Sequence, residues 1–161
     1  MADRVFHFRS PDETSRFAAA LAPLLRPGDT VLLQGGLGAG KSHFARALIL
    51  ARLAAHGLAE DVPSPTFTLV QTYDAGEVEL WHADLYRLSG PDDVLELGLE
   101  EALESAICLI EWPDRLGNIA PDGALTLDFQ MTDAAQERRV TARFTDGRWA
   151  GLLDAAFKGA G

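Results

Sequence analysis

The sequence predicts an α/β fold in which helices pack against a sheet that contains both parallel and antiparallel strands. Short apolar runs typical of buried strands, residues 30–34 and 106–112, alternate with segments whose apolar residues have helical spacing. Two other segments, residues 66–86 and 124–144, have the alternating pattern and the turn residues of β-hairpins. Helices that alternate with buried strands favour parallel pairing, and the hairpins add antiparallel strands.

The composition is typical of one globular domain, which we expect to span residues 1–161. Its hydrophobic content of 47% excludes a disordered chain. No apolar run approaches the length of a membrane span, and the polar start, MADRVFHFRS, is unlike a signal peptide. A single cysteine, Cys108, cannot form an internal disulfide and indicates a reducing compartment. We therefore expect a cytoplasmic protein without membrane association.

The formal net charge of −10 restricts the possible partners. Unaided binding to nucleic acid depends on clustered lysine and arginine side chains that neutralise phosphates. Basic residues are few and scattered in this chain. If nucleic acid takes part in its function, we expect a partner protein to hold it.

The first half of the chain has clear signals for helix boundaries. Residues 10–13, SPDE, form a capping box with proline at the first helical position. The helix that follows buries Phe17 and Leu21 and ends near residues 27–28. A second helix is predicted to begin at Lys41, after the strand and a glycine-rich loop, and to end at Gly57.

The second half is expected to contain a hairpin, a helix, a buried strand, another hairpin and a short final helix. These elements are expected at residues 66–86 with a turn at 74–76, 90–103, 106–112, 124–144 and 152–157.

The loop GGLGAGKS, residues 35–42, carries the strongest functional signal. Gly35, Gly40, Lys41 and Ser42 satisfy the Walker A pattern, and the loop lies between a predicted strand and a predicted helix. Glycines let several backbone N–H groups converge on phosphate oxygens, and the helix points its positive end at the same anion. Lys41 is predicted to reach the β- and γ-phosphates, and Ser42 to ligate Mg²⁺. The alternative is a glycine-rich turn that binds nothing, but the ordered set of strand, loop, lysine, hydroxyl and helix favours the phosphate site.

A phosphate-transferring site also needs an acidic residue for the metal ion and a group that orients the attacking oxygen. Glu111 ends an apolar strand, which is where a Walker B carboxylate lies, and Asp84 follows a hairpin strand. Each has a structural alternative: Glu111 as a solvated acid at a strand end, and Asp84 as the ion-pair partner of Arg87.

Other residues have two interpretations each. Thr66 either senses the γ-phosphate in a switch or lies in a loop that leads into a strand. His82 is more often a packed histidine than a catalyst, and Trp112 either covers the nucleotide or belongs to the core. Residues 114–117, DRLG, match a GTPase pattern, but the chain has no N-K-x-D element to read guanine, so ATP is the expected nucleotide.

Several segments together resemble the TsaE (YjeE) family, small bacterial P-loop ATPases required for threonylcarbamoyladenosine modification of tRNA. The segments are GGLGAGKS, SPTFTLVQTYD, WHADLYRL, DDVLELGLEEAL and ICLIEWPDRL. They occur in the order and spacing of the family from about Glu13 to Arg115, and the match fades beyond Pro121. The resemblance implies a three-layer P-loop NTPase-type fold whose parallel core is flanked by antiparallel strands.

The resemblance also implies roles for individual residues. Ser42 and Glu111 would be the Mg²⁺ ligands, and Asp84 would act in hydrolysis together with Lys41 and Glu111. Thr14 matches a threonine near the adenine, Thr66 lies in a switch-like loop, and Trp112 flanks the nucleotide. The complete set expected to contact ATP is Thr14, Gly36, Leu37, Gly38, Ala39, Gly40, Lys41, Ser42, His43, Thr66 and Trp112.

Two positions depart from the family pattern, which usually has an acidic residue at Gly36 and threonine at Ser42. Serine still supplies the hydroxyl ligand, whereas glycine at position 36 removes a nearby negative charge.

The family further implies a regulatory ATPase that binds a TsaB–TsaD complex and contacts tRNA only through it. We expect low basal hydrolysis, because Arg87 is the one candidate for an arginine finger.

Two other functions share the phosphate-binding loop. One is a small-molecule kinase, although no arginine-rich lid segment appears between the loop helix and Glu111. The other is a nucleotide-dependent binding module without significant hydrolysis. The presence of Ser42, Asp84 and Glu111 together disfavours this module, since a pure binder needs fewer carboxylates.

Overall fold

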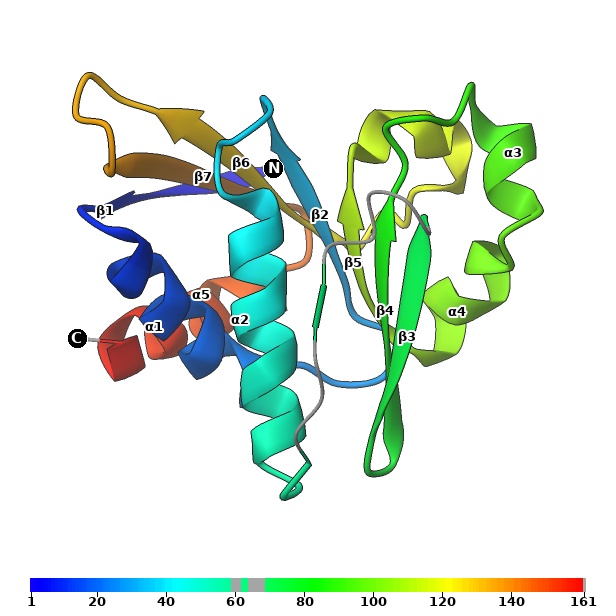
Figure 1. Cartoon of the computed structure of the whole chain (residues 1–161), viewed down its shortest axis with the longest axis horizontal. Coiled ribbons are helices and arrows are strands. Elements are labelled where there is room, and N and C mark those ends of the chain that lie inside the picture. Colours follow the sequence, from blue (N-terminus) through cyan, green and yellow to red (C-terminus); the bar gives the residue numbers. More distant parts are fainter. Residues whose placement is uncertain (59–61, 64–68, 161) are drawn as a thin grey trace.

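The computed structural model describes residues 1–58, 62–63 and 69–160. Within these residues, seven strands form one sheet in the order β1-β7-β6-β2-β5-β4-β3 (Figure 1). The strands are β1 (Ala2–Phe8), β2 (Thr30–Gly35), β3 (Val70–Ala75), β4 (Val78–Asp84), β5 (Ile107–Glu111), β6 (Leu125–Met131) and β7 (Arg138–Phe144). The α-helices are α1 (Pro11–Leu21), α2 (Lys41–Ala54), α3 (Pro91–Leu95), α4 (Leu99–Ser105) and α5 (Arg148–Ala160), and the 3₁₀ helices are η1 (Ala22–Leu24) and η2 (Pro113–Ile119).

The sheet has a parallel centre and antiparallel edges. Strand β2 pairs in parallel with β5 and β6, and β4 pairs in parallel with β5. At one edge β7 and β1 add antiparallel strands, and at the other edge β3 does the same as the partner of β4 in a hairpin. The predicted α/β fold with a mixed sheet is therefore confirmed.

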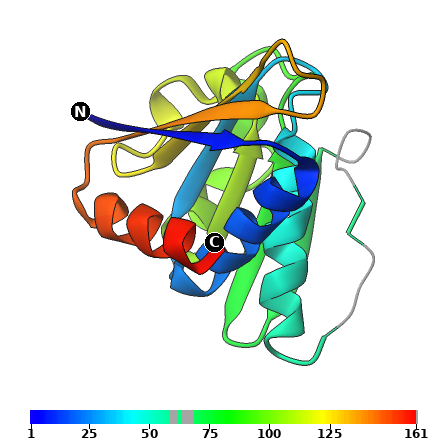
Figure 2. The same ribbon diagram turned by 90° about the vertical axis from the view of Figure 1, so that its left-hand side faces the viewer.

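Helices cover both faces of the sheet, as buried parallel strands require. Helices α1, α2 and α5 lie together on one face, and α3, α4 and η2 cover the other face (Figures 1 and 2). Alternate residues of β2 contribute to the hydrophobic cores on the two faces of the sheet. Val31 and Leu33 pack into the core beneath α1, α2 and α5, whereas Leu32 belongs to the opposite core.

The predicted helix starts are confirmed on the first of these faces. Ser10 Oγ accepts a hydrogen bond of 3.3 Å from the backbone N–H of Glu13, and the Glu13 carboxylate accepts one of 3.0 Å from Arg9 N–H. These contacts form a reciprocal cap around Pro11. Helix α2 begins at Lys41 as expected and ends at Ala54, and Gly57 takes a φ of 69° in the turn that follows.

The single helix expected over residues 90–103 is wrong, because the structure has two short helices, α3 and α4. Gly98 causes the break by adopting a left-handed conformation with φ 78°. A side chain there would also meet the Trp81 ring, which lies 3.8 Å from the position of a Cβ atom. The helical spacing of leucines on both sides of Gly98 conceals this interruption in the sequence.

Three other elements differ from the expectation. Strand β1 was not predicted, because only Phe6 and Phe8 face the core among polar neighbours. Helix α5 is longer than the expected residues 152–157, since its buried face begins at Trp149 and its glycines lower the helical signal. The first hairpin turns at residues 76–77, slightly after the expected position.

Cys108 is buried in β5, and burial raises the pKa of its thiol to about 12. The thiol is therefore protonated and unreactive at neutral pH. In the part of the chain that the structure describes, no helix is long and apolar enough to cross a membrane.

A partly buried ion pair links α5 to the residue that precedes β2. The guanidinium of Arg148 donates two hydrogen bonds of 2.7 Å to the two carboxylate oxygens of Asp29. Asp29 is 7% exposed and also accepts a bond of 2.8 Å from the backbone N–H of Arg26. The hydrogen bond to Asp29 raises the pKa of Arg148 above its ordinary value. Strand β2, which leads into the glycine loop, is thereby held against α5.

Replacing Asp29 by alanine is expected to lower the free energy of unfolding by roughly 1.5–3 kcal/mol, the contribution of a hydrogen bond to a charged group. Urea unfolding of D29A, R148A and the double variant would give the coupling energy of the pair. R4A is the matched control: the exposed Arg4–Asp154 pair, at 3.7 Å, should contribute about 0–1 kcal/mol. If D29A lowers the free energy of unfolding no more than R4A does, the prediction is contradicted.

Candidate phosphate-binding site

Parallel pairing brings the ends of three strands to one edge of the sheet. Leu33 of β2 is level with Glu111 of β5, and Glu111 is level with Asp84 of β4. Strand β2 continues to Gly35, where the glycine loop begins. The loop and the two acidic residues singled out in the sequence are therefore neighbours. This edge, at the carboxyl ends of the strands, is where ligands bind in open α/β sheets.

The loop backbone depends on glycine at its two ends. Gly35 has φ 141°, and a Cβ atom there would lie 2.6 Å from the carbonyl oxygen of Phe129. Gly40 has φ 108° and is the residue that caps α2. Because glycine offers no capping side chain, the first N–H groups of α2 are left for a ligand. Such groups, together with the helix dipole, attract an anion.

Lys41, the first residue of α2, is 5% exposed, and its ammonium group contacts two other residues of the site. Its Nζ atom donates a hydrogen bond of 2.6 Å to the carbonyl oxygen of Gly35 and lies 3.6 Å from the ring centroid of Trp112. Burial lowers the pKa of Lys41, and the charges of Glu111, Asp84 and Asp114 offset this effect in part. For a phosphate in the loop to bind Lys41 Nζ, it would have to replace these two contacts.

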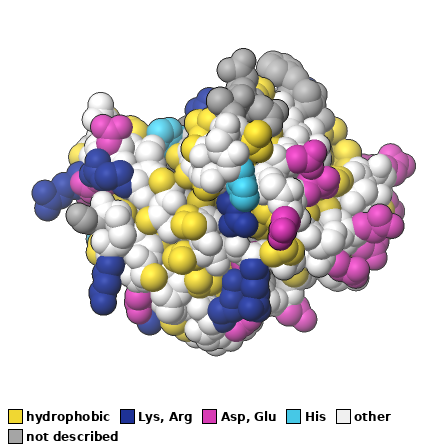
Figure 3. All heavy atoms as spheres, turned by 90° about the horizontal axis from the view of Figure 1, so that it is seen from below, with side chains coloured by type: hydrophobic (Ala, Val, Ile, Leu, Met, Phe, Trp, Pro, Cys, Tyr) yellow, Lys and Arg dark blue, Asp and Glu magenta, His cyan; other side chains and the backbone are white. Residues whose placement is uncertain are grey.

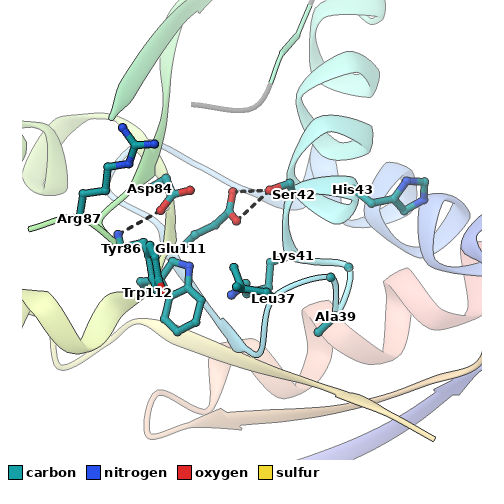
Figure 4. Close-up of a pocket in the computed structure, with 12 residues that line it drawn as sticks. Leu37, Ala39, Lys41, Ser42, His43, Asp84, Tyr86, Arg87, Glu111 and Trp112 are labelled. Atoms are coloured by element: carbon teal, nitrogen blue, oxygen red, sulfur yellow. Dashed lines mark hydrogen bonds between the residues drawn. The ribbon is translucent and has the colours of Figure 1, made fainter. Parts of the chain in front are cut away.

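Ser42 and Glu111 are in direct contact. The Ser42 hydroxyl lies 2.8 Å from Glu111 Oε1 and 3.0 Å from Oε2 (Figure 4). Glu111 is only 2% exposed, so the alternative of a solvated acid at a strand end is wrong. Its Oε2 atom also lies 2.7 Å from Nε2 of His82, which is fully buried and hydrogen-bonded.

Asp84 and Trp112 lie on the other side of Glu111 from Ser42 (Figure 4). Asp84 is 7% exposed and accepts a hydrogen bond of 3.0 Å from the backbone N–H of Tyr86. Trp112 adopts a left-handed conformation with φ 59°, which costs a residue with a side chain about 1–2 kcal/mol. This conformation sets the indole against Tyr86, with ring centroids 4.7 Å apart, and over the ammonium group of Lys41.

A cavity of about 430 Å³ lies among these groups. It is lined by residues 37–43 of the loop and α2, together with Asp84, Tyr86, Arg87, Glu111 and Trp112 (Figure 4). The structure thus brings most of the expected site residues into one place.

Thr14, expected near the adenine, lines a neighbouring cavity of about 230 Å³ with Phe129 and Arg138. The two cavities share Gly38, Gly40 and His43. The His43 side chain points away from Glu111 in Figure 4, and its Nε2 atom lies 2.7 Å from Ser15 Oγ of α1.

Gly36 lines neither cavity and lies on another side of the loop, beside Asp114 and Asp128. Thr66, the expected switch residue, lies outside the described residues, so its role stays a prediction.

The donor atoms at this edge fit a magnesium ion bound with a nucleotide. Hydroxyl and carboxylate oxygens are the ligands that Mg²⁺ prefers, and Ser42 and Glu111 supply one of each at contact distance. In residues 1–58, 62–63 and 69–160, no cluster of three or more His, Cys, Asp or Glu side chains could hold a metal ion. The remaining ligands would therefore come from phosphate and water, as is usual for magnesium–nucleotide sites.

Comparison with known proteins identifies the family. The family model described as "Threonylcarbamoyl adenosine biosynthesis protein TsaE" matches residues 8–140. The chain belongs to the TsaE family. A tRNA threonylcarbamoyladenosine biosynthesis protein TsaE of Rickettsia bellii is 40% identical over 124 residues, which are 77% of this chain and 84% of the relative. The TsaE protein of Bacillus subtilis is 32% identical over 146 residues, 90% of this chain and 88% of the relative.

The fold agrees with this assignment. A crystal structure of Bacillus subtilis YdiB superposes with a TM-score of 0.76 at 26% sequence identity, and the match covers 99% of this chain and 97% of the other. The TsaE family match also extends beyond Pro121, where the sequence motifs end, through β6 and into β7.

Arg138, at the start of β7, is a residue of the site that the sequence analysis missed. Its guanidinium donates a hydrogen bond of 2.9 Å to the carbonyl oxygen of Ala39 and one of 3.3 Å to that of Gly38. A peptide C=O and the following N–H point in opposite directions, so fixing the Ala39 carbonyl turns the Gly40 N–H away from Arg138. Arg138 is about 100 residues from the loop in the sequence, and only the register of β6 and β7 brings them together.

Charge is unevenly distributed over the surface of this TsaE-family protein. Acidic side chains gather at the end of the molecule where α3 and α4 lie (Figure 3). The exposed acids of these helices are Asp92, Glu96, Glu100, Glu101 and Glu104. This surface would repel the phosphates of a nucleic acid.

Replacing Arg138 by alanine is expected to weaken ADP binding about ten-fold or more, which corresponds to 1.4 kcal/mol. The reason is that the loop carbonyls lose the group that fixes their direction. Isothermal titration calorimetry of R138A against R139A tests this. Arg139 is a matched control, because it is exposed and donates to the Gln130 side chain instead of the loop. Equal affinities for the two variants would contradict a role for Arg138 in the loop.

Proposed function

We propose that this TsaE-family protein binds and hydrolyses ATP with Mg²⁺, as a component of the tRNA threonylcarbamoyladenosine machinery that acts with a TsaB–TsaD complex. The observation that carries the proposal is the buried contact between Ser42 and Glu111, next to the lysine of a glycine loop. Burying a carboxylate and a lysine side chain is energetically unfavourable. A turn that binds no ligand would therefore not be expected to have both at this position.

The loop and α2 would bind the phosphates. Backbone N–H groups at the start of α2 provide donors, and Lys41 provides a positive charge once its bond to Gly35 is exchanged for phosphate oxygens. Ser42 and Glu111 would hold Mg²⁺, which neutralises charge on the phosphates during transfer. The cavity with Thr14 adjoins the loop at Gly38 and Gly40 and is the proposed place for adenine.

Asp84 is the proposed group that orients or activates water. It lies level with Glu111 on the neighbouring strand and lines the same cavity as Lys41. Its Oδ1 atom accepts the Tyr86 N–H, which fixes the carboxylate. A fixed carboxylate close to the phosphates can accept a proton from the attacking water. Trp112 would flank the nucleotide once the Trp112 ring no longer contacts the ammonium group of Lys41.

The proposed partners follow from the family and the charge of the chain. TsaE relatives are named as tRNA threonylcarbamoyladenosine biosynthesis proteins. A net charge of −10 disfavours direct binding of tRNA, so contact with tRNA would pass through the partner proteins.

Phosphate release from ATP, measured with and without TsaB–TsaD, tests the proposal. We expect release that requires Mg²⁺, needs no added acceptor and rises when the pair is present. D84N should bind ATP normally but release phosphate about 100-fold more slowly, the smallest usual contribution of a general base. K41A should lose ATP binding itself, because the loop then lacks its cation.

E101Q is the control for the loss of a carboxylate, since Glu101 lies on the exposed side of α4. This variant should release phosphate at the rate of the unchanged protein. If ATP binds but no phosphate appears with or without the pair, the hydrolytic function is wrong. If phosphate transfer occurs only after a small-molecule acceptor is added, the protein is a kinase.

A further inference from the structure

His82 is a buried residue at the site to which no role has been given so far. It lies on β4 two residues before Asp84, and its side chain is fully buried. Its Nε2 atom is 2.7 Å from Glu111 Oε2, and Glu111 is itself only 2% exposed. The two side chains are therefore in contact away from water.

The hydrogen atoms of this cluster can be assigned from its chemistry. A carboxylate only accepts hydrogen bonds, so His82 Nε2 must carry the hydrogen that it shares with Glu111. The Ser42 hydroxyl has one hydrogen and can donate to only one carboxylate oxygen at a time. Of its two contacts with the carboxylate, the shorter one, 2.8 Å from Ser42 Oγ to Oε1, is therefore the favoured one.

The other ring nitrogen shows that His82 is not placed there by packing alone. Among the described residues, Nδ1 of His82 is buried and has no hydrogen-bond partner. Leaving a buried polar group unpaired is energetically unfavourable. An apolar side chain of similar size would avoid this cost, but it could not donate to Glu111.

We propose that His82 is a positioning residue that holds Oε2 of Glu111, so that Oε1 and the Ser42 hydroxyl are presented together to Mg²⁺. This proposal rests on the proposed function, which makes Ser42 and Glu111 the metal ligands. His82 is not among the residues that line the cavity with Lys41. Replacing His82 should therefore weaken binding of the metal ion. It should leave the affinity for the nucleotide without metal unchanged.

The size of the effect follows from comparable groups in metalloproteins. A partner that orients a metal ligand typically accounts for a 10–100-fold difference in metal affinity. Without His82, the Glu111 carboxylate can rotate, and its oxygens no longer hold one arrangement toward Ser42. The apparent Mg²⁺ dissociation constant in the nucleotide complex should then rise by about 10–100-fold, while ADP binding in EDTA should stay within about two-fold.

Fluorescence anisotropy with a labelled ADP measures both quantities. ADP affinity is determined in EDTA, and Mg²⁺ is then titrated into the complex. The variants are H82L, which cannot donate, and H82Q, whose side-chain amide can reach Glu111. H7L is the matched control, because His7 is exposed on β1, far along the sheet from β4. We expect H82L to show the loss, H82Q to recover most of it, and H7L to behave as the unchanged protein.

A variant that does not fold is recognised by its melting curve. In that case H82N replaces H82L, because its shorter amide cannot reach Glu111 and it should show the same loss. Equal Mg²⁺ dissociation constants in H82L, or in H82N, and the unchanged protein would overturn the proposal. So would an equal loss in H82Q and H82L. If the unchanged protein binds ADP without any influence of Mg²⁺, the proposed metal site itself is wrong, and the role of His82 falls with it.

Discussion

The site depends on the parallel register of β2, β5 and β4. Because Leu33, Glu111 and Asp84 lie level with one another, the glycine loop begins beside two carboxylates that come from separate parts of the sequence. A shift of one residue in either pairing would turn Glu111 or Asp84 toward the opposite face of the sheet. The buried, apolar residues of β2 and β5 and the core-facing residues of β4 oppose such a shift. The catalytic geometry proposed here is therefore set by packing of the core.

Lys41, Ser42 and Glu111 are paired with other groups of the protein at this edge. Lys41 is bonded to Gly35 and covered by Trp112, and Ser42 is bonded to Glu111, which is bonded to His82. Buried charges without such partners would destabilise the fold. A bound nucleotide and metal ion would replace the contacts of Lys41 and the contact between Ser42 and Glu111, while the contact between His82 and Glu111 would remain. The affinity for ATP is therefore the difference between the contacts that the nucleotide and metal ion gain and the contacts of Lys41 and Ser42 that they replace.

Much of this arrangement could be predicted from sequence, because its signals are local. A few neighbouring residues are enough to predict three of its features. These are the capping box at Ser10, the loop from Gly35 to Ser42 and the apolar strand that ends at Glu111. The break at Gly98 could not be predicted, since the leucine spacing continues across it. Strand β1 and Arg138 were missed because they acquire their roles only through pairing with segments far away in the chain. The family motifs indicated Ser42 and Glu111 as a pair, but the position of His82 behind them required the register of β4 and β5.

The most direct test of the central claim is a crystal structure of the protein with Mg²⁺ and a non-hydrolysable ATP analogue. We expect phosphates within the loop, with Lys41 Nζ bonded to their oxygens instead of to the Gly35 carbonyl. We also expect a metal ion between Ser42 and Glu111, and adenine in the cavity beside Thr14. Phosphates bound elsewhere would contradict the proposed site. So would phosphates bound in the loop while Lys41 stays bonded to Gly35 and Ser42 stays bonded to Glu111.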